Sequence, residues 1–252
     1  FFINDNHWCS PSPEDTININ YYPSNSSSDI KITAYAKNGF MEYSDSISFK
    51  YMSDSLSFFN DPTLSFVTNN DLSLSIMKFP VTNQLYAKYL QLAYRDSLIN
   101  FNNDSESFTG YFSGTDLIEA GNYDFYIIEN GKLEYNNSLI SIIDTSYNTH
   151  PASGVTWIGA MSFAQYFGWR LPTWEEWNNF SVNDSIKIDI NKVNYQNNFN
   201  STTPAGYFNG TNKGVVKCTE DFHINGLYDL IGNVWEYTST PAEFDPEFII
   251  TY

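Results

Sequence analysis

Residues 226–237 read Gly-Leu-Tyr-Asp-Leu-Ile-Gly-Asn-Val-Trp-Glu-Tyr, the most specific run in this chain. The run brings together two carboxylates, on Asp229 and Glu236, and two backbone carbonyls, at Gly232 and Val234. Hard divalent cations such as Ca²⁺ prefer this mixture of oxygen ligands. The spacing alone favours a plainer interpretation, a buried turn with solvated acids at its edge. A metal site therefore needs further support from the rest of the sequence.

Two other stretches provide that support. One joins residues 150–157 (HPASGVTW), Ala160-Met161 and residues 170–177 (RLPTWEEW), and the other is residues 79–83 (FPVTN) followed by Tyr86 and Leu90. With residues 226–237, they resemble the HPVxxVSWxDA...RLPTEAEW, EVTNxxYxxFL and GLYDMxGNVWEW signatures of the formylglycine-generating enzyme family, also called sulfatase-modifying factors. Because the three motifs occur in the family's order, the probability of chance agreement is very small.

The resemblance implies a fold and two calcium sites. The fold is α+β, irregular and loop-rich, and related to C-type lectins. One calcium site would take the Asp229 and Glu236 side chains and the Gly232 and Val234 carbonyls. The other site would involve four residues whose loop is shortened here and in which an Asn replaces the usual Asp: Asn194, Tyr195, Asn197 and Phe199.

The resemblance also implies an activity. Family enzymes use O₂ to oxidise a cysteine of a protein or peptide substrate to formylglycine, with copper held by two cysteines, and soft thiolates suit Cu(I). This chain has two cysteines, Cys9 and Cys218, and neither matches a catalytic position of the family. We therefore assign no catalytic residue and expect the copper-binding pair beyond Tyr252. Oxidoreductase activity depends on that pair.

A second interpretation is a non-catalytic module. Some secreted surface and gliding-motility lipoproteins carry this fold without the catalytic cysteines, and they bind a surface partner or serve a structural role. A glycan-binding role is a further alternative, encouraged by an aromatic content of 18% but by no specific motif. The three motifs do not distinguish these roles from the oxidase because they belong to the scaffold.

Amino-acid composition limits the classes of partner that the chain can bind. The net charge is −17, with 12 Lys and Arg among 252 residues, which argues against nucleic acid because binding to phosphates needs cationic side chains. No stretch of about 18 apolar residues predicts a transmembrane helix. His7, His150 and His223 do not form a ligand cluster in the sequence. An acidic, Asn- and Ser-rich chain fits a secreted, periplasmic or cell-surface protein.

The chain divides into three regions by pattern. Residues 1–55 alternate like β-strands around an Asn38-Gly39 turn, which predicts part of an immunoglobulin-like or fibronectin-like β-sandwich. Residues 56–75 are predicted to form a linker or edge strand, and residues 76–252 a C-terminally incomplete sulfatase-modifying-factor-like domain. Because the first residue is Phe1 and not Met, we interpret the chain as a fragment.

Local signals place several elements in the third region. Thr82 is a good N-cap for a first helix, and a second helix is expected from Trp157 to Phe167, ending at Gly168. Thr173 and Glu176 have capping-box spacing for a third. Other predictions are a buried structural Arg170 that bridges loop carbonyls and Glu175 or Glu176, and a hairpin of residues 123–129 with residues 132–135 around Asn130-Gly131.

Overall fold

The computed structural model divides the chain into two compact units, Phe1–Asn60 and Asp61–Tyr252. It describes the backbone of residues 2–3, 6–7, 27–38 and 41–52 in the first unit. In the second unit it describes residues 61–69, 74–115, 118–181, 193–195, 199–211 and 223–240.

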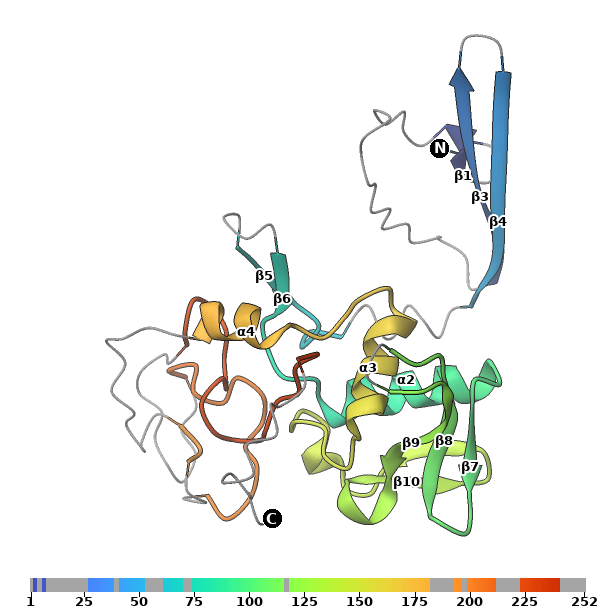
Figure 1. The fold of residues 1–252 in the computed structure, drawn as a ribbon. Coiled ribbons are helices and arrows are strands. Elements are labelled where there is room, and N and C mark those ends of the chain that lie inside the picture. Colours follow the sequence, from blue (N-terminus) through green and yellow to red (C-terminus); the bar gives the residue numbers. More distant parts are fainter. Residues whose placement is uncertain are drawn as a thin grey trace. The chain divides into compact units, whose positions relative to one another are not determined.

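The first unit contains an antiparallel sheet (Figure 1). Its strands are β1 (Phe2–Ile3), β2 (Asn6–His7), β3 (Ser27–Asn38) and β4 (Met41–Met52), in the order β2-β1-β3-β4. The hairpin of β3 and β4 turns between Asn38 and Met41, which are paired in the register. The alternating residues on either side of the predicted turn thus form strands. The alternation at residues 16–20 lies outside the described residues, and the relation to a particular β-sandwich stays a prediction.

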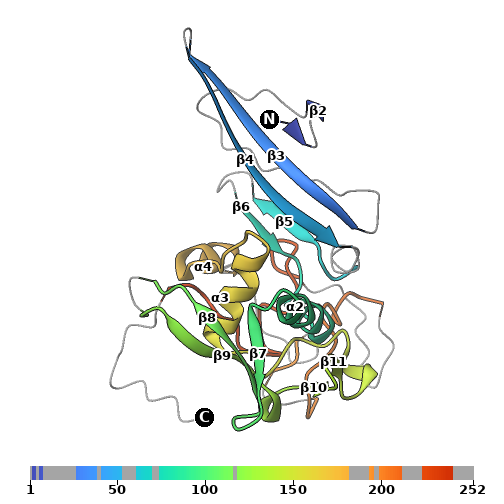
Figure 2. The ribbon, with the colours of Figure 1, turned by 90° about the vertical axis from the view of Figure 1, so that its right-hand side faces the viewer.

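The second unit is a mixed α/β body of small sheets and helices (Figures 1 and 2). A hairpin of β5 (Phe66–Asn69) and β6 (Leu74–Met77) comes first. The elements that follow are α2 (Asn83–Arg95), β7 (Ile99–Asn102), β8 (Ser107–Phe112), β9 (Gly121–Ile127), the 3₁₀ turn η1 (Ile128–Asn130), β10 (Leu133–Asn136), β11 (Leu139–Ile142), the 3₁₀ turn η2 (Thr145–Tyr147), α3 (Trp157–Tyr166) and α4 (Trp174–Ser181). The mixed class is as predicted, whereas the likeness to C-type lectins stays a prediction. None of the described helices is long and apolar enough to cross a membrane.

Helix α2 begins where the sequence predicts. The Thr82 hydroxyl accepts a hydrogen bond from the Leu85 backbone N–H at 3.2 Å, which satisfies one of the unpaired donors at the helix start. Leu85, Tyr89 and Leu92 recur at helical spacing, and all three are buried. The polar side is tied to the start of the unit, because Lys88 Nζ lies 2.9 Å from an Asp61 carboxylate oxygen.

Aromatic side chains fill the core between the helices and the sheets. Helix α2 packs against β7 and β11, and α3 packs against β9. Tyr86, Tyr89 and Phe163 lie with ring centroids 5.3 to 5.8 Å apart, in the range of stabilising aromatic pairs. The Tyr86 hydroxyl donates to the Phe125 carbonyl of β9 at 3.1 Å, so this buried polar group is paired.

The predicted hairpin around Asn130-Gly131 is wrong. Strand β9 pairs with β8, the 3₁₀ turn η1 follows it, and β10 pairs with β11 instead. The β10–β11 hairpin has the two-residue turn Asn137-Ser138, at φ 50° and 66°, which is the left-handed geometry that such turns require. Gly131 instead follows the 3₁₀ turn η1 in an extended conformation, at φ −126° and ψ −162°, and not in the left-handed region that such a turn requires.

The starts of α3 and α4 are also as predicted. Thr156 caps α3, and Gly168 follows it at φ +74°. In the α4 capping box, the Thr173 N–H donates to Glu176 at 2.9 Å and the Glu176 N–H donates to the Thr173 hydroxyl at 3.1 Å. Arg170 binds both Glu176 carboxylate oxygens, at 2.6 and 2.7 Å, and the Leu171 carbonyl at 3.2 Å. The prediction that Arg170 is buried is wrong, because its side chain is 56% exposed.

Gly159 provides a test of the α3 packing. A Cβ at this position would collide with the Phe125 carbonyl of β9, so Gly159→Ala must push the helix away from the sheet. Alanine normally stabilises a helix interior by ~1 kcal/mol relative to glycine. We expect the opposite here, a loss of ~1–3 kcal/mol in the free energy of unfolding, as for other overpacked sites, measured by urea denaturation.

Gly168→Ala is the matched control. No atom lies within 4 Å of a Cβ built at Gly168, and only its φ of +74° disfavours alanine, which costs ~1–2 kcal/mol. A larger side chain distinguishes the two positions. Gly159→Ser should be more destabilising than Gly159→Ala, because the contact is steric, whereas Gly168→Ser and Gly168→Ala should have nearly the same stability. Equal stability of Gly159→Ala and the unmodified chain would contradict this packing.

Candidate functional site

The 226–237 run begins with a tight turn and continues as an irregular loop. Ile224 and Leu227 exchange two backbone hydrogen bonds of 2.8 and 2.9 Å, across Asn225 and Gly226, which both have positive φ. Leu227 and Tyr228 are buried and anchor the turn. Three of the next residues, Asp229, Gly232 and Asn233, also have positive φ. The backbone between the candidate ligands is therefore neither helix nor strand, as a loop that presents carbonyl oxygens requires.

Asp229 and Glu236 face an environment that disfavours their charged forms. Burial raises the pKa of Asp229 to about 6, against a hydrogen bond of 2.6 Å from the Gly206 N–H to its carboxylate, which lowers it. Glu236 is exposed as a residue, and desolvation of its carboxyl group is what disfavours its charged form. This desolvation raises the pKa of Glu236 to about 7, and the charge of Asp229 adds to the shift, whereas a hydrogen bond from Trp177 opposes it.

The two candidate carbonyls lie in a tight bend. The Val234 N–H donates to the Gly232 carbonyl at 2.8 Å, which uses one of the two lone pairs of that oxygen. Only glycine fits at position 232, because its φ is +82° and a Cβ would collide with the Asn194 carbonyl. The Gly232 carbonyl thus keeps a lone pair for a cation.

The residues of the other predicted calcium site are only partly brought together. Asn194 reaches the 226–237 run, where its carbonyl accepts from the Asn233 N–H at 2.7 Å. Tyr195 is 40% exposed, and Phe199 packs against Tyr207 and Phe208. Asn197 lies outside the described residues. This ligand set stays a prediction.

Asn233 holds the loop to the turn at residues 202–206, a contact that no sequence pattern predicted. Its side chain accepts from the Thr203 N–H at 2.9 Å and donates to the Thr203 carbonyl at 3.0 Å. It also accepts from the Asn194 amide at 3.3 Å. Asn tolerates the φ of +61° at this position. The sequence feature that could have indicated this role is an Asn directly after a glycine in a loop, because Asn side chains at such positions often form hydrogen bonds with backbone groups.

His150 extends these contacts to the FPVTN motif. Its Nδ1 lies 2.8 Å from the Thr202 hydroxyl, and its carbonyl accepts from the Asn83 N–H at 2.9 Å. Burial lowers the pKa of His150 from its ordinary value, so the ring is neutral at physiological pH. We assign it the structural hydrogen-bonding role that its place in the HPASGVTW run suggests. The three motifs therefore meet in one network of hydrogen bonds.

Residues 236–240 lie along the starts of both later helices. Glu236 accepts from Trp177 Nε1 at 2.8 Å, and the Thr238 carbonyl accepts from Trp157 Nε1 at 2.8 Å. The Ser239 N–H donates to the Pro172 carbonyl at 2.8 Å. The candidate ligand Glu236 is thus positioned by α4, and the residues after it by α3 and by the turn before α4.

The described residues do not fit a copper site of the family's type. They include no cysteine, because Cys9 and Cys218 both lie outside them. In the part of the chain that the structure describes, no group of three or more His, Cys, Asp and Glu side chains converges. We therefore derive no oxidation step from the described residues.

Comparison with known families decides the identity of the second unit. A family model described as "Sulfatase-modifying factor enzyme 1-like domain" matches residues 67–246, more than half of the chain. The chain belongs to this family. The match includes all three motifs and the network of hydrogen bonds that connects them.

Curated relatives resemble shorter parts of the chain. "Serine/threonine-protein kinase Pkn1" of Chlamydia trachomatis serovar L2 is 34% identical over 113 residues, covering 41% of this chain and 16% of the relative. "Inactive C-alpha-formylglycine-generating enzyme 2" of Bos taurus is 34% identical over 102 residues, covering 36% and 33%. "Formylglycine-generating enzyme" of Mus musculus is 30% identical over 103 residues, covering 36% and 27%. The matches span a third or less of these relatives.

Asn233→Ala tests the role of this side chain. The change leaves the Thr203 N–H and carbonyl without partners in a buried residue, and each lost partner costs ~1–3 kcal/mol. We expect the free energy of unfolding to fall by at least ~2 kcal/mol, measured by urea denaturation.

Asn225→Ala is the matched control, because Asn225 also has a positive φ, 52°, but is exposed and bonds only one described backbone oxygen, that of Phe180. It should cost clearly less than Asn233→Ala. Equal losses for the two variants would show that the strain of alanine at a positive φ, and not the lost contact with Thr203, causes the fall in stability.

Proposed function

We propose that the second unit is a calcium-stabilised domain of the formylglycine-generating type. Its Ca²⁺ ligands are the Asp229 and Glu236 carboxylates and the Gly232 and Val234 carbonyls. The observation that carries the proposal is the arrangement of one short irregular loop. The loop presents both acids where burial disfavours their charged forms, the charge of Asp229 raises the pKa of Glu236 further, and among the described residues no cation of the protein contacts either acid.

A bound Ca²⁺ has a clear physical role in this loop. It would neutralise the repulsion between Asp229 and Glu236 and fix a backbone with several left-handed residues. It would also fix Glu236, and through it the hydrogen bond to Trp177 of α4. The ion is structural in this proposal and takes no part in catalysis.

The activity we propose for the whole protein is O₂-dependent oxidation of a cysteine in a protein or peptide substrate to formylglycine. Membership of the family supports it, and so does the relative named "Formylglycine-generating enzyme". A copper ion bound by two thiolates would supply the redox chemistry. The described residues contribute no thiolate to such an ion, and in this proposal they form the scaffold that orients the substrate.

A non-catalytic binding module is the second candidate. A relative named "Inactive C-alpha-formylglycine-generating enzyme 2" is 34% identical, which is no less than the relative named as an enzyme. The stretch shared with the relative named "Serine/threonine-protein kinase Pkn1" covers only 16% of that protein. A similar stretch therefore also occurs as a small part of a longer protein that is not named as a formylglycine-generating enzyme. In this role the partner is an extracellular surface component. The acidic composition supports an extracytoplasmic location for either role.

A substrate assay distinguishes the two candidates. The full-length protein, loaded with Cu(I) and supplied with O₂, is incubated with a library of cysteine-containing peptides. With an added thiol as the reductant, the reaction would convert the cysteine side chain to an aldehyde and release its sulfur as hydrogen sulfide, while O₂ is reduced to water and the added thiol is oxidised to its disulfide. A hydrazine probe captures the aldehyde, and mass spectrometry detects the product. We expect an aldehyde that requires both copper and O₂. If the protein is shown to be folded and every peptide is recovered with its thiol intact, the oxidase proposal is rejected and the non-catalytic binding module is favoured.

Calcium removal tests the metal site. We expect the melting temperature to rise with Ca²⁺ and to fall in a chelator, because a ligand at 100 times its Kd stabilises the folded state by ~2.7 kcal/mol. Asp229→Asn and Glu236→Gln should each remove most of this response. Differential scanning calorimetry with and without Ca²⁺ measures it.

Asp104→Asn is the control for net charge, because Asp104 is an exposed acid in the turn between β7 and β8. It should keep the full calcium response. A melting temperature that is the same in Ca²⁺ and in chelator would reject the site, and so would an unchanged response in Asp229→Asn and Glu236→Gln.

A further inference from the structure

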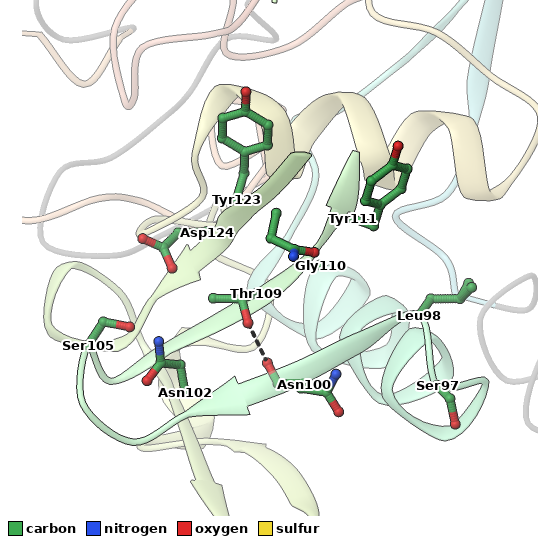
Figure 3. A pocket seen from close by; sticks show the side chains of 11 residues that line it. Ser97, Leu98, Asn100, Asn102, Ser105, Thr109, Gly110, Tyr111, Tyr123 and Asp124 are labelled. Carbon is green, nitrogen blue, oxygen red and sulfur yellow. Dashed lines mark hydrogen bonds between the residues drawn. The ribbon is translucent and has the colours of Figure 1, made fainter. Parts of the chain in front are cut away.

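The sheet of β7, β8 and β9 carries a hollow that the proposed calcium and oxidation chemistry does not use. Its volume is about 740 Å³, within the ~300–1,000 Å³ typical of small-molecule sites. Figure 3 shows Tyr111 toward one end of the hollow and Asn102 and Ser105 toward the other. The hollow is therefore an elongated site that spans three strands.

The strand register arranges the lining in rows. Asn100 of β7 is opposite Thr109 of β8, which is opposite Asp124 of β9. In the next row, Tyr111 is opposite Asn122. Side chains alternate between the two faces of a strand, so these residues share the outer face, whereas Phe108, Phe112 and Phe125 on the same strands are buried in the core.

The lining matches a ligand that is neutral and rich in hydroxyl groups. Among the described lining residues, Asp124 is the one charged side chain, and its carboxylate already accepts a hydrogen bond from Ser107. Asn100, Asn102 and Asn122 carry amides, which donate and accept at once, as hydroxyl groups do. An anionic ligand would find no cation here, and the net charge of −17 would repel it.

Two large apolar surfaces lie beside the amides. Tyr111 is 66% exposed and Leu98 is 55% exposed. A pyranose ring offers hydroxyl groups at its edge and a C–H face that packs on an aromatic ring, so it matches both parts of the lining. Tyrosine suits such contacts because its apolar ring ends in a polar hydroxyl.

A plain solvated face is the simplest alternative, because antiparallel sheets commonly expose one polar face. Solubility, however, is normally served by charged side chains, and Asp124, whose carboxylate already accepts from Ser107, is the one charged residue of the described chain that lines the hollow. A solvated face also needs no concavity and no exposed tyrosine beside its amides. The combination favours recognition over solvation.

We propose that this hollow binds a neutral oligosaccharide. Tyr111 packs under one sugar ring, and Asn100 and Asn122 bind the hydroxyl groups of that ring or the next. The proposal holds whether the domain oxidises a substrate or only binds a partner, because the hollow contains none of the proposed calcium ligands.

Isothermal titration calorimetry of the full chain tests the proposal. The probes are short neutral oligosaccharides of glucose, mannose and N-acetylglucosamine, with galacturonate oligomers as the anionic comparison. We expect binding of at least one neutral series and none of the anionic one. Tyr111→Ala should weaken binding at least tenfold, whereas Tyr111→Phe keeps the ring and should retain most of the affinity.

Matched variants control for folding and for exposure. Leu98→Ala should weaken binding, whereas Leu139→Ala should not, because Leu139 is similarly exposed, at 59%, but lies on β11 outside the lining. Asp229→Asn should keep the glycan affinity even if it loses the calcium response, so failure of the two proposals can be told apart. Melting temperatures confirm that each variant is folded.

Several results would overturn the proposal. One is the absence of binding to every neutral series at millimolar concentration. Others are a preference for galacturonate, or an affinity that Tyr111→Ala leaves unchanged. Binding of an extended peptide to the edge of β7, with Tyr111→Ala without effect and neutral glycans inactive, would assign the face to a peptide partner instead.

Discussion

The pairing of the Asn233 side chain with the Thr203 backbone is the contact on which the second unit depends. The Asn233 amide pairs with both the N–H and the carbonyl of buried Thr203, as a neighbouring β-strand would do. It does so from a loop that has no regular secondary structure. Thr203 in turn adjoins Thr202, which contacts His150, and His150 contacts the first turn of α2. Three distant motifs are thereby tied together by side-chain and backbone hydrogen bonds instead of by a shared sheet.

This construction explains how a loop-rich unit holds a defined shape. Its sheets are small, and the described helices are short, so regular structure alone provides few long-range constraints. The aromatic core of Tyr86, Tyr89 and Phe163 fixes α2 against α3, and the motif network fixes the loops around that core. The candidate calcium site lies in this network, so an ion there would stabilise the part with the least regular backbone.

Local features were predictable from sequence, and long-range partners were not. The Thr82 cap and the Thr173–Glu176 box depend on neighbours within one turn, and both are found as expected. The predicted Asn130-Gly131 hairpin is wrong because β9 pairs with β8 and β10 with β11, and the periodicity of a single sequence does not reveal which strands pair. The family's motifs identified Asp229 and Glu236 as candidates, but the partner of Asn233 lies 30 residues away. Only the fold could show that contact.

The hydrogen bond from Trp157 to Thr238 joins residues 81 positions apart in the chain. Contacts of such high sequence separation slow folding, because a long loop must close before they form. During synthesis, the start of α3 leaves the ribosome well before residue 238 exists. The Trp157 indole therefore remains without its acceptor until the 226–237 run and the residues just after it have been translated, so α3 can dock fully only after that point of synthesis.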